Sequence, residues 1–243
     1  MTTDDAPILE GRALRVERGA KVLVRDVDVE AFGGEVLGVL GPSGAGKSTL
    51  FRALVGEQAL ESGTVLLEGK EISSWPLWRR ARAGIGYVPQ GPSVLFDLTV
   101  RENLLAFQKL ALGDETGAEA PAQRVELTKR LDVRAGELSA GERRRLEVAR
   151  ALTRTPTVLI CDEPFAGVDP AGATHLGGIL RELADDGVAV ILADHHVAEA
   201  LRICDRAALL LDGAVALCKE PDEFVEHELV RGRYLGTWTP TSS

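Results

Sequence analysis

Long hydrophobic runs are missing from this sequence of 243 residues. No stretch approaches the ~20 consecutive apolar residues that an α-helix needs to cross a bilayer. The first residues, MTTDD, also lack the basic start and the apolar segment of a secretory signal peptide. These absences favour a cytoplasmic protein, and any role at a membrane must then pass through a partner.

Cysteine and positive charge are scarce as well. Cys161, Cys204 and Cys218 are odd in number and form no C-x-x-C pair, which argues against a disulfide framework or a cysteine-bound zinc site. The sequence has 28 Lys and Arg against 37 Asp and Glu, a formal net charge of −9. Because a nucleic-acid-binding protein usually presents a basic face or tail, we expect no nucleic-acid partner.

The hydrophobic residues that are present follow the periods of an α/β fold. Residues 22–29 alternate between apolar and polar, as in a half-buried antiparallel strand. Near-continuous apolar runs at 157–161 and 188–193 are typical of strands buried on both faces of a parallel sheet. Further strands are expected at 35–40, 63–67 and 207–211, and a helix at 47–55. The pattern predicts a mainly parallel core sheet with a separate antiparallel portion.

A helical block interrupts these strands between residues 99 and 152. The segments LTVRENLLAFQKL, RVELTKRL and GERRRLEVARAL carry apolar residues at helical spacing, and residues 113–121 between the first two indicate a loop. We therefore expect a single domain at 8–236 that contains a helical subdomain at about 99–154, followed by a polar tail at 237–243.

A phosphate-binding loop follows the strand at 35–40. The segment GPSGAGKST matches G-x-x-x-x-G-K-[ST] between a strand and a helix, the context that this motif requires. Its glycines let successive N–H groups point inward toward phosphates at the positive end of the helix dipole, and its lysine adds a cation. The expected ATP-binding residues are Gly41, Pro42, Ser43, Gly44, Ala45, Gly46, Lys47, Ser48 and Thr49.

Two acids stand at the end of the buried strand VLICDEP. Asp162 is the expected anchor of Mg²⁺ together with the Ser48 hydroxyl, and Glu163 is expected to polarise the water that attacks the γ-phosphate. A guanine-specificity motif of the N-K-x-D type is absent from the sequence, which argues against a GTPase.

Further motifs follow the loop in a fixed order. They are Gln90 in GYVPQ, LSAGE at residues 138–142, Asp169 in AGVDP, and His195 in LADHH. In this order and context they resemble the Q-loop, signature motif, D-loop and switch histidine of ABC ATPases. The resemblance covers residues 41 to 196, while the adjacent His196 is interpreted as a surface or packing residue.

The resemblance implies an ATPase that works as a homodimer. In the family the signature motif faces the γ-phosphate held by the other protomer, so Ser139, Ala140, Gly141, Glu142 and Asp169 are expected at the partner's ATP. Gln90 is expected to touch Mg²⁺ and the attacking water, and His195 the γ-phosphate. Integral membrane transporter subunits are implied as partners, with docking that includes residues 91–100. The chain is then peripheral on the inner face of the cell membrane.

Finer details resemble particular transporters. The segments PLWRRARAGIGYVPQ, EPFAGVDP and DHHVAEAL are similar to those of ATPases from lipopolysaccharide export systems. Two alternatives remain open, the ATPase of a branched-chain amino acid importer and an ABC protein without a transport role. Two departures from the family stand out: Glu17 occupies the position expected for the aromatic residue that stacks on adenine, and Ala140 replaces the usual signature glycine.

Overall fold

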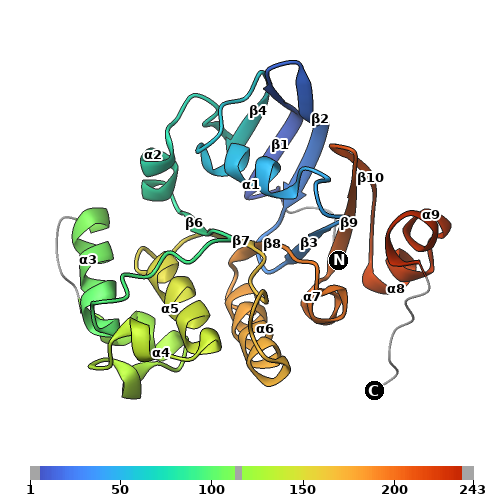
Figure 1. The fold of residues 1–243 in the computed structure, drawn as a ribbon. Helices are drawn as coiled ribbons and strands as arrows, with labels where there is room; N and C mark the ends of the chain where they lie inside the picture. The colour runs from blue at the N-terminus through green and yellow to red at the C-terminus, as the bar shows by residue number, and fades with distance from the viewer. Residues whose placement is uncertain (1–5, 113–116, 237–243) are drawn as a thin grey trace.

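The computed structural model describes residues 6–112 and 117–236. Its core is a six-stranded sheet in the order β10-β9-β3-β8-β7-β6 (Figure 1). The neighbouring strands from β9 to β6 pair in parallel, and β10 pairs antiparallel with β9. The strands are β3 (Val36–Leu40), β6 (Ile85–Val88), β7 (Val158–Asp162), β8 (Ala189–Ala193), β9 (Arg206–Leu211) and β10 (Ala214–Lys219).

The central strands are buried because both of their faces are covered. All five residues of β7 and of β8 are buried. Successive side chains point to opposite faces of a strand, so Val158 and Ile160 join one hydrophobic cluster while Leu159 and Cys161 join the other. The near-continuous apolar runs in the sequence are explained by this two-sided burial.

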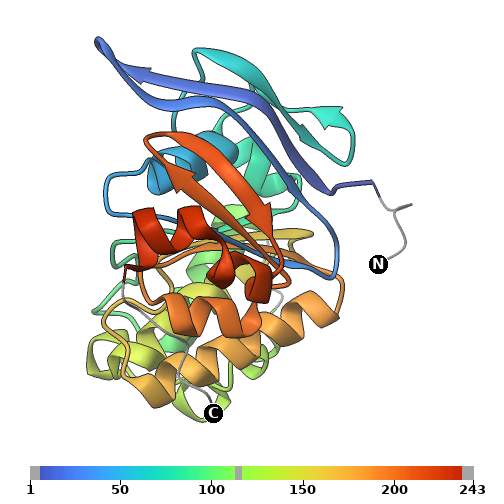
Figure 2. The ribbon, with the colours of Figure 1, turned by 90° about the vertical axis from the view of Figure 1, so that its right-hand side faces the viewer.

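A second, antiparallel sheet has the order β2-β1-β4-β5. It consists of β1 (Leu9–Arg18), β2 (Lys21–Ala31), β4 (Ser62–Leu67) and β5 (Lys70–Glu71). Helix α1 (Lys47–Val55) buries Leu50, Phe51 and Leu54 in the cluster that this sheet shares with one face of the core sheet. Figure 2 shows the antiparallel sheet on one side of the core sheet and α5 and α6 on the other.

The remaining helices surround the second face and the edges of the core sheet (Figure 1). Leu146 of α5 and Leu176 of α6 are fully buried in the cluster on this face. None of the helices in the described residues combines the length and the hydrophobicity that crossing a membrane requires. The helices are α2 (Leu77–Arg82), α3 (Val100–Leu112), α4 (Glu119–Arg124), α5 (Ala140–Leu152), α6 (Pro170–Asp185), α7 (Val197–Ile203), α8 (Pro221–Glu226) and α9 (Glu228–Val230), with short turns of 3-10 helix at Thr128–Arg130 and Ala135–Glu137 and a π-helix at Arg231–Leu235.

The predicted fold class is confirmed, with two local corrections. The segment RVELTKRL is not a helix: α4 ends at Arg124, and Glu126 takes a left-handed φ of 55° that a helix cannot contain. The loop predicted at 113–121 is also partly wrong, because α4 already begins at Glu119. Residues 113–116 and the predicted tail at 237–243 lie outside the described residues.

Candidate functional site

The phosphate-binding loop connects β3 to α1 through glycines that no other residue replaces easily. Gly41, Gly44 and Gly46 have φ values of 153°, 80° and 109°, which side-chain-bearing residues rarely adopt. A Cβ atom at Gly41 lies 2.2 Å from the Leu210 carbonyl oxygen, and one at Gly46 lies 2.6 Å from that of Leu23. The loop therefore keeps its curl only with glycine at these positions.

Lys47 is held inside this loop at 8% exposure. Its ammonium donates hydrogen bonds to the carbonyl oxygens of Gly41, at 2.7 Å, and Pro42, at 3.0 Å. Burial lowers the pKa of Lys47, and nearby carboxylates, Glu163 first, act in the opposite direction. The cation is thus fixed at the mouth of the loop, within the field of the acids that follow β7.

Asp162, at the end of β7, is 1% exposed, and neither carboxylate oxygen has a hydrogen-bond partner among the described residues. Burial raises the pKa of Asp162, the charge of Glu163 raises it further, and the Ser48 hydroxyl favours the charged form. An unpaired buried carboxylate is costly unless a cation or a donor meets it. Asp162 and Ser48 together therefore form an oxygen site suited to a hard divalent cation.

Glu163 adopts an uncommon backbone conformation beside Asp162. Its φ is 51°, and its N–H donates to the Ala193 carbonyl oxygen at 2.7 Å. Its carboxylate lies 3.5 Å from His195 Nδ1. Residues held in sparsely populated backbone regions cluster at functional sites, and here the strained turn lies between the ends of β7 and β8.

A hollow of about 730 Å³ is lined by half of the predicted site residues, and Asp162 is not among them. It includes Gln90, Glu163 and His195, which come from three separate segments that follow strands of the core sheet. Ligands of open α/β sheets bind at this carboxyl edge. Its lining consists of Arg18, Lys21, Leu23, Ser43, Gly44, Gly46, Lys47, Ser48, Thr49, Gln90, Glu163 and His195.

The signature residues do not line this hollow. Ser139 caps α5: its hydroxyl accepts from the Glu142 N–H at 3.2 Å, and the Glu142 carboxylate accepts from the Ser139 N–H at 2.9 Å. Ala140 lies instead beside a second hollow with Gln90, and Asp169 caps α6 by accepting from the Gly172 N–H at 3.0 Å. These residues, with Gly141, belong to a separate surface of the same chain.

The position expected to contact the base needs a correction. Arg18, rather than Glu17, lines the nucleotide hollow. The Glu17 carboxylate instead accepts a hydrogen bond from Arg15 at 2.8 Å. A guanidinium can stack on an aromatic face, so Arg18 offers the hollow a flat cation on which a base could stack.

Arg144 is a structural centre of the site that the motifs do not reveal. It is 7% exposed, and its guanidinium donates to the carbonyl oxygens of Asp162, at 2.7 Å, and Glu163, at 2.9 Å. It also donates to the carbonyl oxygen of Pro89, at 2.9 Å, and to Glu147, at 2.5 Å. In the sequence, Arg144 is visible only as one arginine of the run RRR in α5. In the structure it lies on the buried face of α5 and ties this helix to the ends of β6 and β7.

Asp194, also missed by the sequence analysis, anchors the turn after β8. It is 0% exposed. Its Oδ2 accepts from the Phe165 N–H at 2.8 Å, and its Oδ1 accepts from the His196 N–H at 2.8 Å. This carboxylate therefore joins the segment after Glu163 to the segment that carries His195.

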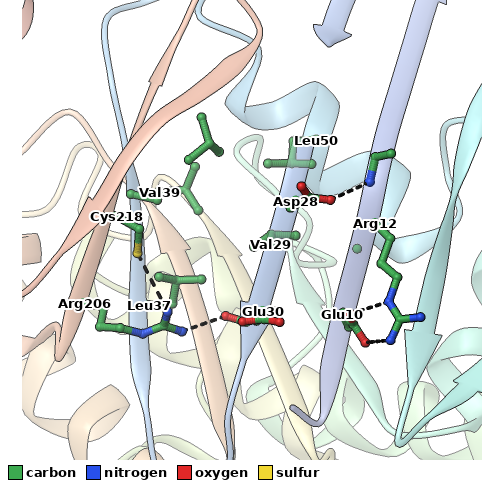
Figure 3. A pocket seen from close by; sticks show the side chains of 14 residues that line it. Glu10, Arg12, Asp28, Val29, Glu30, Leu37, Val39, Leu50, Arg206 and Cys218 are labelled. Carbon is green, nitrogen blue, oxygen red and sulfur yellow. Dashed lines mark hydrogen bonds and ion pairs between the residues drawn. The ribbon is translucent and has the colours of Figure 1, made fainter. Parts of the chain in front are cut away.

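A separate hollow of about 470 Å³ lies between the two sheets (Figure 3). Val29, Val39 and Leu50 form its apolar floor. At one rim Arg206 donates to the Glu30 carbonyl oxygen at 2.9 Å, and at the other Arg12 pairs with Glu10 at 2.8 Å. None of the nucleotide-site residues lines it.

An apolar groove opens on another side, between α2, β6, α3 and α5. Leu77, Tyr87 and Phe107 are among its lining residues. Beside it the exposed fraction of Trp78 is 60%, and in the segment after Gln90 that of Phe96 is 48%. Exposed apolar side chains that gather in one place mark interaction surfaces.

Comparisons with known proteins agree with this geometry. The family model described as "ABC transporter" matches residues 24–166. The lipopolysaccharide export system ATP-binding protein LptB of Acidithiobacillus ferridurans is 39% identical over 94% of this chain and 97% of that protein. LptB of Escherichia coli (strain K12) is 40% identical over 90% of this chain and 92% of that protein.

Solved structures show the same fold. A nucleotide-free ATP-binding cassette from an ABC transporter has a TM-score of 0.87 and 25% identity, covering 95% of this chain and 99% of its own. The ADP conformation of the cassette MJ1267 has a TM-score of 0.87 at 26% identity, with the same coverage. A dimeric cassette bound to ADP and Pi reaches a TM-score of 0.77 at 23% identity, covering 88% of this chain and 98% of its own.

Proposed function

This chain belongs to the ABC transporter family and is the ATP-hydrolysing subunit of such a transporter, and from this premise we propose that it drives lipopolysaccharide export through integral membrane partners. The observation that carries the proposal is its identity of 39–40%, over at least 90% of the chain, to two lipopolysaccharide export ATPases. These relatives do not favour the amino acid importer or an ABC protein without a transport role. We propose that the nucleotide-binding domain spans residues 8–236 and contains a helical subdomain at about 99–154.

The proposed nucleotide is ATP with Mg²⁺. The N–H groups of residues 43–49 and the Lys47 ammonium hold its phosphates, because both present positive charge to one hollow. Ser48 and Asp162, joined by Gln90, hold the ion, and the two unpaired buried oxygens of Asp162 support this assignment. When bound, Mg²⁺ neutralises charge that develops on the phosphates.

Glu163 is the proposed base of hydrolysis. Its carboxylate lines the hollow and accepts or polarises a proton of the attacking water, while its backbone is fixed by the bond to Ala193. His195, 3.5 Å from Glu163, contacts the γ-phosphate, and Gln90 orients the same water. Arg144 fixes the position of the Glu163 backbone relative to Pro89, the residue before Gln90, by donating to both carbonyl oxygens.

The proposed active form is a homodimer. Ser139, Ala140, Gly141, Glu142 and Asp169 lie outside their own chain's hollow, so they are free to complete the hollow of a second copy. The N-terminus of α5, with 13 residues, offers phosphate the positive end of its dipole. Two copies that exchange this surface form an isologous pair with two ATP molecules between them.

The membrane partner docks in the apolar groove between α2, β6, α3 and α5. The exposed Leu77 lines this groove, and so does Ser93, which belongs to the segment 91–100 that the family resemblance indicates. Leu95 and Phe96 of the same segment are exposed as well. Docking there makes the chain peripheral on the inner face of the cell membrane, with its cargo contacts supplied by the partner.

The test is copurification from membranes after crosslinking, with bound integral subunits identified by mass spectrometry. We expect lipopolysaccharide export subunits with the wild-type chain. Leu77→Glu places a charge in the groove that Leu77 lines and is expected to reduce recovery of the partners by about tenfold, the scale of one desolvated charge at an interface. The matched control is Leu110→Glu, since Leu110 is 77% exposed and does not line the groove. Recovery of importer subunits, or of none, contradicts the proposal.

A further inference from the structure

Asp194, His195 and His196, which follow β8, offer three metal-ligating atoms that lie within 4.8 Å of one another. His196 Nδ1 lies 2.8 Å from Asp194 Oδ1, and His195 Nδ1 lies 3.5 Å from the same oxygen. Glu163 Oε2, from the turn after β7, lies 3.5 Å from His195 Nδ1. Two imidazoles and two carboxylates thus meet at the edge of the nucleotide hollow.

These separations match the ligand shell of one small cation. Zinc takes imidazole nitrogen and carboxylate oxygen at about 2.0–2.2 Å in a tetrahedron, which puts neighbouring ligand atoms about 3.3 Å apart. Within the cluster of Asp194, His195 and His196, the observed separations of 2.8 and 3.5 Å from Asp194 Oδ1 bracket that value. An ion therefore fits after shifts of a few tenths of an ångström by His195 and His196, since Asp194 is fixed by the N–H groups of Phe165 and His196.

The donor types select a different ion from the one at the phosphates. Imidazole suits zinc and the other late first-row cations, whereas magnesium prefers oxygen ligands. His196 is the discriminating residue, because the proposed hydrolysis uses Glu163 and His195 but has no role for it. In the metal-free site its Nδ1 lies 2.8 Å from Asp194 Oδ1, so a metal ion at Nδ1 replaces this hydrogen bond and requires the tautomer whose proton is on Nε2.

We propose that Asp194, His195 and His196 form a zinc site beside Glu163, separate from the magnesium site of Ser48 and Asp162. The site is inhibitory, a consequence that rests on the proposed function. A bound zinc ion occupies the His195 imidazole that contacts the γ-phosphate, and its charge then stands beside the Glu163 carboxylate, which acts on water and lies 3.5 Å from His195 Nδ1. Release of the ion returns both groups to the catalytic site.

Binding is tested on the nucleotide-free full chain, which makes the result independent of ATP hydrolysis. All proteins carry Cys218→Ser, because Cys218 is exposed and a thiol binds zinc. Titration calorimetry with Zn²⁺, together with the visible absorption of bound Co²⁺, is expected to show one site in the parent protein. His196→Ala is expected to weaken it about tenfold or more, the scale on which metal sites respond to loss of their supporting groups.

The matched control is His227→Ala, which removes a histidine at the start of α9. We expect its zinc affinity to equal that of the parent. No binding by the parent protein, equal binding by His196→Ala, or an equal loss in His227→Ala would overturn the site.

Inhibition is tested on the assembled transporter at saturating Mg-ATP. Without zinc, His196→Ala is expected to hydrolyse ATP at the parental rate. With zinc, its half-inhibitory concentration is expected to rise by the same factor as its dissociation constant. Equal inhibition of both proteins overturns the inhibitory role. A parent that hydrolyses no ATP contradicts the proposed function, whereas the calorimetric result still decides the site.

Discussion

At the scale of single residues, Asp162 shows the conflict between stability and metal binding. Its carboxylate is buried without a hydrogen bond, so Asp162→Asn is expected to raise the free energy of unfolding of the nucleotide-free protein by roughly 1 kcal/mol. The same change is expected to abolish Mg-dependent hydrolysis. Thermal unfolding without and with Mg-ATP measures both effects, because ligand binding stabilises only the protein that retains the site.

The difference in unfolding free energy between the Asp162→Asn variant and the wild type depends on pH, and the direction follows from the sign of the Asp162 pKa shift. Burial raises the pKa of Asp162 above its ordinary value of 3.8, so the folded protein holds this proton to higher pH than the unfolded chain. The contribution of Asp162 to stability therefore falls as the pH rises from 3.8 through the raised pKa. The stability of the Asp162→Asn variant does not fall in this way, because asparagine does not titrate. We expect the advantage of the variant to grow toward neutral pH. An advantage that shrinks contradicts the assignment.

Arg18 is expected to hold the base without selecting it. A guanidinium stacks on any purine, so the protein is expected to discriminate only weakly between ATP and GTP. Arg18→Ala is expected to weaken both nucleotides alike by about 2–5-fold, equivalent to 0.5–1 kcal/mol. Competition binding measures the ratio. Arg12→Ala, in the same strand but beside the other hollow, serves as the control. A strong ATP preference means that another residue reads the base.

Motifs in the sequence identify residues that contact ligands better than residues that position them. The proposed roles of Lys47, Asp162 and Glu163 follow from the sequence because phosphate and metal chemistry demand those side chains at a fixed spacing. The role of Arg144 does not, since most of its partners are backbone carbonyl groups in two other segments, and those leave no pattern in the sequence. Arg18 and Glu17 were confused because a shift of one residue in a strand exchanges its faces.

At the scale of elements, Arg144 joins α5 to the ends of β6 and β7. Arg144→Lys keeps the charge but cannot reach the same set of carbonyl groups, because lysine lacks the planar fork. We expect the free energy of unfolding to fall by roughly 2 kcal/mol and hydrolysis to slow while ATP still binds. Urea denaturation and nucleotide binding measure these effects. Arg145→Lys, whose partner is the His175 side chain, is the matched control, and an equal loss there contradicts the role.

Elements were predicted well where burial and backbone agree. The helix expected at 47–55 is α1, and the runs at 157–161 and 188–193 are β7 and β8 within a residue. The error at RVELTKRL has a physical cause. Val125, Leu127 and Leu131 are buried in the core cluster, so their spacing imitates a helical face. The backbone between them turns through a left-handed residue, Glu126, and a 3-10 turn.

At the scale of the whole molecule, one chain holds two halves of an ATP site that do not meet. The phosphate loop and Glu163 line one hollow, and the capped N-terminus of α5 at Ser139 lies outside it. The order of motifs in the sequence predicts both halves, and their separation in space supports the proposal that a second copy completes the site. A variant that binds ATP without consuming it is therefore the sharpest probe of assembly.

Glu163→Gln keeps the size of the side chain and removes its charge, so hydrolysis is expected to fall by ~10² or more while binding survives. The retained Mg-ATP is then shared by two copies and shifts the equilibrium to the dimer by mass action. Size-exclusion chromatography is expected to show a dimer only with nucleotide. Adding Ser139→Arg places a bulky cation at the shared site and is expected to abolish the dimer, whereas Glu71→Arg, on the exposed strand β5, is not. Thermal unfolding checks that the double variant is folded, since losing the cap costs about 1 kcal/mol. A Glu163→Gln protein that stays monomeric at saturating ATP shows that the two halves belong to different sites.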